Sequence, residues 1–318
     1  MARADGPDPA FLNDVLAGMA LPQKAVPARW FYDEAGSHLF EEITQLPEYY
    51  PTRTETAILR ACGGELGAQV GPGRAVVEFG SGSSLKTPLV LDAIAPAAYV
   101  PIDISGDFLR ASSASLGKRM PDLAIHPVEA DFMHPVALPV AVADMPKLGF
   151  FPGSTIGNLT PFAATELLRS MAATLGDDAQ LLIGFDLIKD QEVLIAAYDD
   201  AAGVTARFNL NLLHRINREA GGTMPVDAFR HNARWNDPQA RIEMHLVARR
   251  AVSFEIAGRS FAMAEGESIH TENSHKFSPR SAALLLAAGG WRVRSQWADE
   301  NELFAVMLAE IAPPTTAP

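Results

Sequence analysis

A run of residues from Val76 to Lys86 limits the folds open to this chain more than any other feature of it. Two β-branched residues precede the acid Glu78, the turn Gly80-Ser81-Gly82 follows, and a segment that can be helical extends to Leu91. A strand, a tight glycine turn and a helix N-terminus in this order form a nucleotide-binding corner of an open α/β sheet. Glycine permits positive φ angles and close backbone approach, and the helix start offers free N–H groups. The stretch therefore predicts an α/β domain that binds a nucleotide or a nucleoside.

The turn departs from the dinucleotide-binding fingerprint at one position. The pattern Gly-x-Gly-x-x-Gly would have its third glycine where this chain has Leu85. An acid shortly before the first glycine, as Glu78 is here, favours a class I S-adenosylmethionine methyltransferase, in which the turn faces the methionine part of the cofactor. By itself the motif also fits an ordinary glycine-rich turn between a strand and a helix.

The next two predicted strands end in acidic residues. Residues 97–103 form the second strand, and Asp103 at its end follows Glu78 by about 25 residues. An acid at this place in a doubly wound fold hydrogen-bonds the ribose hydroxyls of a nucleoside. Residues 125–130 form the third strand and lead into Asp131 and Phe132, which suit hydrogen bonding to the adenine amino group and stacking on its ring. A solvated aspartate beside a core phenylalanine is the alternative for that pair.

The loop after the fourth predicted strand is rich in glycine, serine, threonine and asparagine over residues 153–160. Because ligands bind at the carboxyl ends of the strands in an open α/β sheet, we expect this loop close to the reacting atoms. Thr160 and Pro161 are typical of a helix N-cap and of the first helical residue. With a fifth strand over residues 180–186, strands and helices alternate as in a doubly wound sheet.

The pattern changes near Lys189. Predicted helices cover residues 191–203 and 208–220, and predicted strands cover residues 241–248, 253–256, 260–263 and 268–277. After a helix over residues 279–288, residues 291–297 and 304–309 predict a closing hairpin, which is typical of class I methyltransferases. We therefore predict a class I, Rossmann-like domain over residues 55–188 and 278–318, which binds the cofactor. A second α+β lobe over residues 1–54 and 189–277 is predicted to bind the substrate.

Charge, cysteine and histidine content argue against several kinds of ligand. The formal net charge of −12 disfavours nucleic acids and anionic membrane surfaces, which both favour basic patches. Cys62 is the only cysteine, and His270 and His275 beside Glu272 lack further converging ligands, so neither a disulfide nor a metal is predicted. The N-terminus lacks the apolar core of a signal peptide, and the apolar runs are too short to span a membrane. We expect a soluble, cytoplasmic monomer.

Four residues of the second lobe suit a pocket for a small polar substrate. Tyr32 and Tyr49, in turn-like surroundings, could line a pocket with an apolar ring and a polar tip. Glu272 and Ser274 are two residues apart, so their side chains share one face of a strand. A carboxylate beside a hydroxyl suits a substrate that carries an N–H group. A packed N-terminal arm and a solvated strand face are the alternatives.

Beyond these residues, the chain resembles the histidine-specific Nα-methyltransferases of ergothioneine biosynthesis nearly from end to end. The resemblance is carried by residues 30–33 (WFYD), 46–55 (LPEYYPTRTE), 78–83 (EFGSGS), 153–161 (GSTIGNLTP), 197–205 (AYDDAAGVT), 241–244 (RIEM) and 271–277 (TENSHKF). The chain departs from the family pattern at Asn273 and His275 and over residues 151–153.

The resemblance implies S-adenosyl-L-methionine as the cofactor and L-histidine as the substrate, with up to three methyl transfers that end at the betaine hercynine. It implies that the cofactor is held by Tyr32, Gly80, Lys86, Asp103, Asp131 and Phe132. It implies that the substrate is held by Gly153, Asn158 and Tyr198 at its amino and carboxylate groups and by Tyr49, Met244, Glu272 and Ser274 around its imidazole. It implies no catalytic acid or base, and Asn158 and Tyr198 would act by positioning.

Other functions remain open at this stage. An N-methyltransferase of another amino acid or of an indole amine, such as a tryptophan derivative, would use the same chemistry with a different pocket. A nicotinamide-dependent oxidoreductase is disfavoured by the missing third glycine, and a non-catalytic S-adenosylmethionine-binding regulator would need a partner-binding feature that the sequence does not show.

Overall fold

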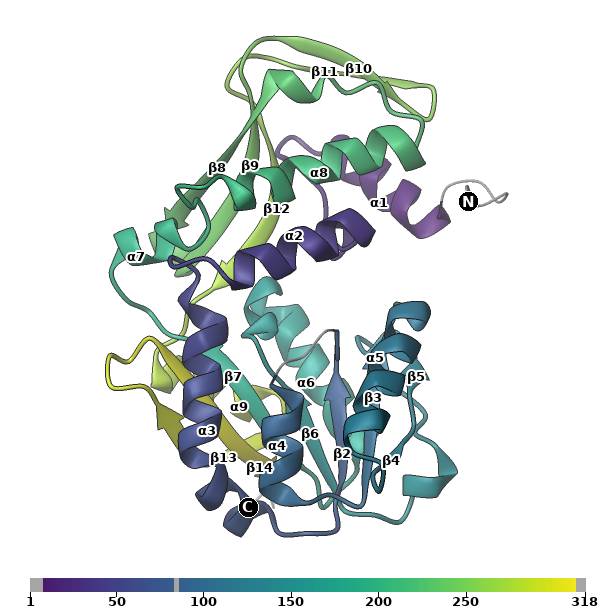
Figure 1. Ribbon diagram of the computed structural model, residues 1–318. Helices are drawn as coiled ribbons and strands as arrows, with labels where there is room; N and C mark the ends of the chain where they lie inside the picture. The colour runs from purple at the N-terminus through teal and green to yellow at the C-terminus, as the bar shows by residue number, and fades with distance from the viewer. Residues whose placement is uncertain (1–7, 83–85, 313–318) are drawn as a thin grey trace, which may run out of the picture. The chain divides into compact units, whose positions relative to one another are not determined.

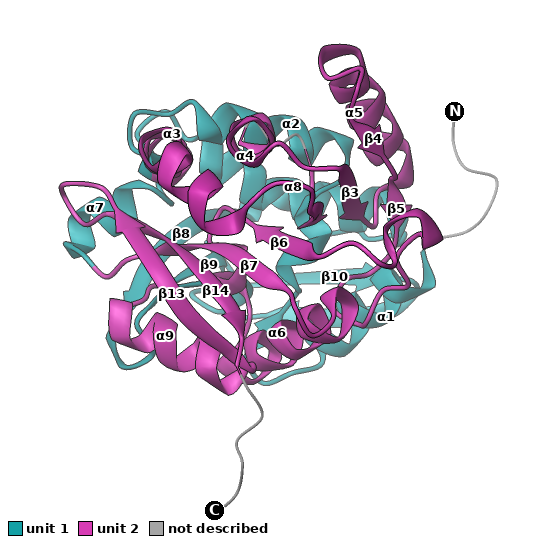
Figure 2. Ribbon diagram, turned by 90° about the horizontal axis from the view of Figure 1, so that it is seen from below, with its two compact units in different colours: residues 1–50, 189–275 teal, residues 51–188, 276–318 magenta. Residues whose placement is uncertain are grey.

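The computed structural model describes residues 8–82 and 86–312, which form two compact units (Figure 2). Unit 1 comprises residues up to Tyr50 together with Lys189–His275, and unit 2 comprises Pro51–Ile188 together with the chain from Lys276 onward. The predicted turn residues 83–85, the N-terminus before Asp8 and the tail after Ala312 lie outside the described residues. Within the described ranges, no helix has both the length and the apolar character that a membrane crossing requires.

Unit 2 is built on one mixed sheet whose strand order is β13-β14-β7-β6-β2-β3-β4, with β5 paired to β3 beside β4. The pairs among β2 to β7 are parallel, and β14 pairs antiparallel with both β7 and β13, so the predicted closing hairpin is confirmed. The strands are β2 (Ala75–Phe79), β3 (Ala98–Asp103), β4 (Ala124–Ile125), β5 (Val128–Glu129), β6 (Lys147–Phe151), β7 (Gln180–Asp186), β13 (Trp291–Ala298) and β14 (Phe304–Ile311).

Helices cover both faces of this sheet, as Figure 2 shows for α3 and α4 on one side and α6 and α9 on the other. Every residue of β2 is buried, because Val77 and Phe79 face the core beneath α6 and α9 while Val76 faces the core beneath α3 and α4. Parallel strands enclosed in this way read as continuous apolar runs. The helical segments are α3 (Tyr50–Val70), α4 (Thr87–Ile94), α5 (Gly106–Arg119), η2 (Val140–Val142), η3 (Thr155–Asn158), α6 (Pro161–Leu175) and α9 (Pro279–Ala288).

One predicted strand of unit 2 is divided. Residues 125–130 were expected as a single strand, but β4 ends at Ile125 and β5 begins at Val128. Pro127 lies between them and has no N–H group to donate to a neighbouring strand. The N-cap prediction at Thr160 is confirmed, since its side chain accepts a hydrogen bond from the Ala163 backbone and Pro161 begins α6.

Unit 1 holds a sheet of order β1-β12-β9-β8 and a separate hairpin of β10 and β11. Figure 1 shows α8 lying across β8 and β9, and its apolar face shares one core with α1 and these strands. The strands are β1 (Lys24–Ala25), β8 (Phe229–Asn236), β9 (Arg241–Ala248), β10 (Val252–Ile256), β11 (Arg259–Met263) and β12 (Ser268–His275). The helical segments are α1 (Pro9–Met19), η1 (Ala28–Phe31), α2 (Glu34–Thr44), α7 (Gln191–Ala196), α8 (Val204–Glu219), η4 (Val226–Ala228) and η5 (Asp237–Gln239).

The helix bounds after residue 190 differ from the prediction. The helix expected over residues 191–203 ends at Ala196, and the helix expected from 208 begins at Val204. Asp200 explains the early start, because its carboxylate accepts hydrogen bonds from the backbone N–H groups of Val204 at 2.9 Å and Thr205 at 2.7 Å. Together with Gly203 at a φ of 69°, this side chain ends the turn and caps α8.

The unit boundaries lie a few residues from the predicted domain boundaries. Residues 51–54 fall in unit 2 because α3 begins at Tyr50, whereas the prediction began that domain at residue 55. Lys276 and Phe277 also fall in unit 2, because Lys276 forms an ion pair with Asp186 at 2.7 Å and Phe277 bridges to Leu187.

Candidate cofactor and substrate sites

The turn after β2 is closely packed against an aromatic ring. Gly80 has a φ of 73°, and an ideal Cβ at this position would lie 3.3 Å from Cε1 of Phe132. The Phe132 ring meets Phe79 and Phe151 edge to face, with centroid separations of 6.3 and 6.0 Å. The glycine is therefore required both by the backbone conformation and by the neighbouring ring.

Two carboxylates lie beside this turn at the ends of neighbouring strands. Asp103 at the end of β3 accepts hydrogen bonds from the backbone of Gly82 at 3.3 Å and of Ser105 at 2.9 Å. The backbone N–H of Ala130 donates to the Asp103 carbonyl at 3.1 Å, which places the following Asp131 at the same edge of the sheet. Asp131 is exposed and accepts from the Met133 backbone at 3.0 Å. The structure thus brings together four predicted cofactor residues, namely Gly80, Asp103, Asp131 and Phe132.

Lys86, the fifth predicted cofactor residue in unit 2, lies beside a predicted substrate residue. Its ammonium group forms a buried ion pair with Glu55 at 2.5 Å, and the same carboxylate oxygen accepts the Gly153 backbone N–H at 2.8 Å. Gly153 has a φ of 79° and follows β6. Glu55 has no role predicted from the sequence, although it lies in the segment LPEYYPTRTE that carries the family resemblance.

The acid of the opening motif has a structural function. Glu78 is fully buried on β2, and one of its oxygens accepts hydrogen bonds from the Thr87 hydroxyl at 2.7 Å and the Tyr99 hydroxyl at 2.5 Å. It therefore ties β2 to the start of α4 and to β3. Burial, followed by the charge of Glu78, raises the pKa of Tyr99 well above its usual range, so this phenol stays a donor.

The loop that carries Asn158 is fastened to the sheet. Ser154 adopts a φ of 55°, its hydroxyl accepts the Asp186 backbone N–H at 2.9 Å, and its carbonyl accepts the Gly157 N–H at 2.8 Å. Asn158 is half-buried at the end of the short helix η3. The predicted substrate residues Gly153 and Asn158 thus belong to one ordered turn of unit 2.

Three of the four predicted imidazole-binding residues lie on one face of the unit 1 sheet, namely Met244, Glu272 and Ser274. Met244 on β9 stands directly opposite Glu272 on β12, and residues opposite each other in an antiparallel pair project to the same face. Ser274, two residues beyond Glu272, shares that face, and its hydroxyl is hydrogen-bonded to the Tyr198 hydroxyl at 2.7 Å. The structure therefore groups Met244, Glu272, Ser274 and Tyr198.

A β-bulge decides which residues of β12 face this group. The pairing of β12 with β9 shifts between His270 and Glu272, so that Thr271 is an extra residue. The Thr271 hydroxyl donates to the Met244 carbonyl at 3.0 Å and holds the bulge. Strict alternation would have placed His270 beside Glu272, but the bulge turns it to the opposite face, where it stacks on His245 with ring centroids 4.7 Å apart.

Aromatic rings surround the group from the N-terminal segments of unit 1. Tyr49 packs against Phe40 and Tyr198, at centroid separations of 6.2 and 6.4 Å, and Tyr32 packs against Phe40 and Phe208, at 5.6 and 5.8 Å. Tyr32, the sixth predicted cofactor residue, thus lies in unit 1, apart in the chain from the other five.

Two buried residues that the sequence analysis missed hold Tyr198 in place. The His231 Nε2 atom lies 2.8 Å from the Tyr198 carbonyl oxygen, so this nitrogen carries the proton and donates. The other ring nitrogen, Nδ1, then accepts from the Asn209 amide at 2.9 Å. Burial lowers the pKa of His231, which favours this neutral form. No sequence pattern indicated this role for His231, because no strand was predicted over residues 229–236, where β8 lies.

Among the described residues, one group of three has side chains spaced as metal ligands are: Glu243, His245 and His270, with ligand atoms within 4.8 Å of one another. The Glu243 carboxylate already accepts hydrogen bonds from Arg234 at 2.8 Å and Arg241 at 2.6 Å, so two guanidinium charges would oppose a cation. The two imidazole planes differ by only 9°, so their in-plane lone pairs do not converge on one point. The donor set does not fit a metal.

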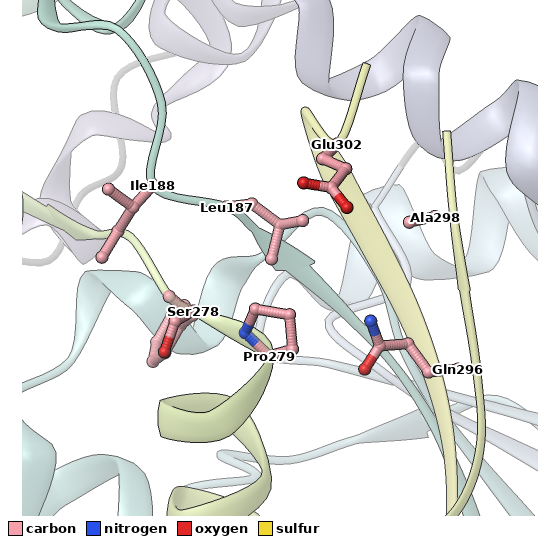
Figure 3. Close-up of a pocket in the computed structure, with 8 residues that line it drawn as sticks. Leu187, Ile188, Ser278, Pro279, Gln296, Ala298 and Glu302 are labelled. Atoms are coloured by element: carbon pink, nitrogen blue, oxygen red, sulfur yellow. The ribbon is translucent and has the colours of Figure 1, made fainter. Parts of the chain in front are cut away.

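A small cavity in unit 2 contains none of the predicted site residues (Figure 3). It has a volume of about 130 Å³ and is lined by Leu187, Ile188, Phe277, Ser278, Pro279, Gln296, Ala298 and Glu302. The cavity is too small for a nucleoside cofactor, since ligand pockets typically exceed about 300 Å³.

The sequence model of the family described as histidine-specific, S-adenosylmethionine-dependent methyltransferases matches residues 11–311. The chain belongs to this family. The predicted enzyme class, the S-adenosylmethionine cofactor and the class I α/β fold are thereby confirmed.

Named relatives agree with this membership. The chain is 43% identical to the histidine N-alpha-methyltransferase of Mycolicibacterium smegmatis, with 96% of each chain covered. It is 41% identical to the protein of the same name from Mycobacterium tuberculosis, with 94% of each covered. It is also 27% identical to ergothioneine biosynthesis protein 1 of Neurospora crassa, where the match covers 90% of this chain and 33% of that longer protein.

Proposed function

We propose that this histidine-specific methyltransferase transfers methyl groups from S-adenosylmethionine to the α-amino nitrogen of free L-histidine, as in ergothioneine biosynthesis. Up to three transfers would give the trimethylated betaine hercynine. The names of the mycobacterial and fungal relatives support the substrate and the pathway. A cytoplasmic location and a monomeric state remain predictions.

The arrangement of Met244, Glu272, Ser274 and Tyr198 carries this proposal. A neutral imidazole has one N–H donor and one acceptor nitrogen. The Glu272 carboxylate would accept the donor, and the hydroxyl pair of Ser274 and Tyr198, already 2.7 Å apart, would present an O–H to the acceptor. The Met244 side chain on the same face would contact the flat apolar part of the ring. A site built to pair both nitrogens discriminates strongly against amines that lack them.

The residues at the strand ends of unit 2 fit the cofactor. Asp103 would accept the ribose hydroxyls, and Asp131 and Phe132 would bind the adenine. The turn at Gly80, which has no Cβ against Phe132, would let the backbone approach the methionine portion. Tyr32 and Lys86 would complete the set of cofactor contacts. Bound S-adenosylmethionine supplies an electrophilic methyl group on a sulfonium sulfur.

The chain's contribution to the reaction is positioning. Gly153, Asn158 and Tyr198 would hold the substrate's amino and carboxylate groups, with Tyr49 beside the imidazole, so that the nitrogen lone pair points at the methyl carbon. Orienting two reactants in this way accounts for a large share of a typical rate enhancement. The α-amino group has a pKa of roughly 8 or above, so it must lose one proton to water before each transfer.

The direct test is to incubate the protein with S-adenosylmethionine and a pool of free amino acids and to identify the methylated products by mass spectrometry. Trimethylated histidine as the product supports the proposal. Methylation of another amino acid, or of an added tryptophan derivative, would keep the reaction and discard the imidazole pocket. Cofactor binding without any methylated product would instead favour a regulator.

The pocket itself is tested by Glu272→Ala. Calorimetry should show a large loss of histidine affinity, on the order of 100-fold, while the affinity for S-adenosylhomocysteine changes little. Glu255→Ala is the matched control, since Glu255 is an exposed glutamate on β10 of the same unit. Equal losses for both ligands in Glu272→Ala would contradict the assignment.

A further inference from the structure

Glu55 on α3 places a buried carboxylate near the unit 2 site. The roles assigned above do not use it. A buried carboxylate is costly unless charges and hydrogen bonds compensate it, so its contacts show what it does.

One oxygen of Glu55 joins two loops that come from different strands. Oε2 accepts from the Lys86 ammonium at 2.5 Å, and from the Gly153 backbone N–H at 2.8 Å. Lys86 ends the loop after β2, and Gly153 lies in the loop after β6. The Lys86 nitrogen also lies 3.8 Å from the position of an ideal Cβ on Gly153, so all three groups form one compact cluster.

The sheet leaves a space for this carboxylate. An ideal Cβ at Gly184 on β7 would lie 2.3 Å from Oε1 of Glu55 and 2.9 Å from Cε1 of Phe304. Only glycine at position 184 admits the Glu55 side chain in its present orientation. Oε1 itself has no hydrogen-bond partner among the residues that the structure describes. Among the described residues, the Glu55 carboxylate thus forms its hydrogen bonds through Oε2, with Lys86 and Gly153.

We propose that Glu55 is a positioning residue for methyl transfer, which fixes the cofactor lysine and the substrate loop relative to each other. This inference rests on the function proposed above. A lysine ammonium has three N–H groups, so Lys86 can donate one to Glu55 and still offer two to the cofactor. Gly153, held by the same oxygen, sets the start of the turn that ends at Asn158. Glu55 therefore aligns the two reactants without touching either.

The test is Glu55→Gln, which keeps the size of the side chain and removes its charge. We expect kcat to fall roughly 10- to 100-fold, because a misalignment of about 1 Å costs a factor of that order. The KM for histidine and the affinity for S-adenosylhomocysteine should change less than about threefold, and the melting temperature should show that the fold persists. Glu65→Gln is the matched control, since Glu65 is an exposed glutamate on the same helix. It should keep wild-type kcat.

Two further variants separate positioning from a merely structural role. If Glu55 acts by linking Lys86 to Gly153, the double variant Glu55→Gln/Lys86→Met should lose clearly less kcat than the product of the two single losses. Glu55→Asp keeps the charge on a shorter stem and should recover part of the lost kcat, and it carries the test if Glu55→Gln does not fold. An unchanged kcat in the variant that folds, or multiplicative losses in the double variant, would overturn the proposal.

The outcome is distinguishable from failure of the proposed function. If the wild-type protein methylates an amine other than histidine, that amine becomes the substrate in the same kinetics, because the Glu55 contacts involve none of the imidazole-binding residues. Loss of kcat in Glu55→Gln would then still support the positioning role, while the histidine assignment would have failed.

Discussion

The two proposed ligand-binding regions of this molecule are built in different ways. In unit 2 the proposed cofactor edge is made largely of backbone, with Gly80 at a positive φ and carboxylates that follow directly from the ends of strands. In unit 1 the proposed substrate face is made of side chains from β9, β12 and the segment after α7, brought together by strand register and a bulge. The first kind of site depends on chain geometry at one place, and the second depends on long-range pairing. The two should therefore fail in different ways when perturbed.

The largest expected effect is a loss of cofactor affinity when the glycine turn of the proposed cofactor site is changed. Gly80→Val combines a β-branched residue at positive φ with a Cβ against Phe132, and we expect S-adenosylhomocysteine affinity to fall at least roughly 100-fold. Gly176→Val is the control, because Gly176 has a φ of 88° with nothing near its Cβ position. Titration calorimetry should show that the control binds as the wild type does. Equal affinity losses in both variants would mean that backbone strain alone is responsible.

Acid should affect unit 1 through its stacked histidines. Burial lowers the pKa of His245 to about 4, with the neighbouring His270 acting in the same direction and Glu243 opposing it. His245 is neutral in the folded state, while in the unfolded chain it takes up a proton below a pH of about 6.5. Its contribution to stability is therefore present above pH 6.5 and is lost as pH falls toward 4, by up to roughly 3 kcal/mol.

Urea unfolding at several pH values measures this loss. Other polar side chains also face or surround the stacked pair of His245 and His270, namely those of Ser268, Glu243, Arg234 and Arg241. The Glu243 pKa is raised by burial, but the donors Arg241, Asn236 and Arg234 outweigh this and hold it well below its ordinary value. Its own loss of stabilisation therefore begins only below about pH 4.5. His245→Gln should flatten the pH dependence between 6.5 and 4.5, and an unchanged slope would contradict the assignment to His245.

A smaller effect is expected from the hydroxyl pair of the substrate face. Ser274→Ala removes one partner of the 2.7 Å contact with Tyr198, and we expect histidine affinity to fall about tenfold, or about 1–2 kcal/mol. Tyr198→Phe should have a similar effect. Because the two hydroxyls orient each other, the double variant should lose less than the sum of the single losses. Strict additivity in binding titrations would show that they act independently.

The smallest effect should come from the support behind Tyr198. His231→Gln replaces the ring that donates to the Tyr198 carbonyl, and kcat/KM for histidine should fall severalfold, equivalent to about 1 kcal/mol. The affinity for S-adenosylhomocysteine should be unchanged. A drop in both measurements would indicate general destabilisation, which a thermal melt would reveal.

The difference between the regions also explains what the sequence could predict. Local sequence patterns predicted most strands of unit 2, the Gly80 turn and the position of Asp103. They could do so because turn residues and acidic residues mark the ends of these strands in the sequence. The shared face of Glu272 and Ser274 followed from their spacing. The sequence could not predict that His270 faces the opposite side of the sheet, because the bulge at Thr271 arises only when β12 pairs with β9.

Residues that act through others left no local signal. Glu55 lies at a helical position whose neighbours give no hint of a bond to Gly153, which is 98 residues away. Asn209 and His231 lie on different elements and meet only in the folded unit. Such residues could be recognised only as polar residues at buried positions. Burial depends on the fold, so the sequence does not reveal it.

The pairing of β1 with β12 affects the order in which the chain can fold during its synthesis. Lys24 lies opposite Ile269, and the Gln23 side chain bonds to the Ser268 carbonyl across 245 residues. Unit 1 therefore cannot complete its sheet until synthesis has proceeded through β12. β1 must wait for a partner strand that follows it by about 245 residues, and by then unit 2 already has most of its strands.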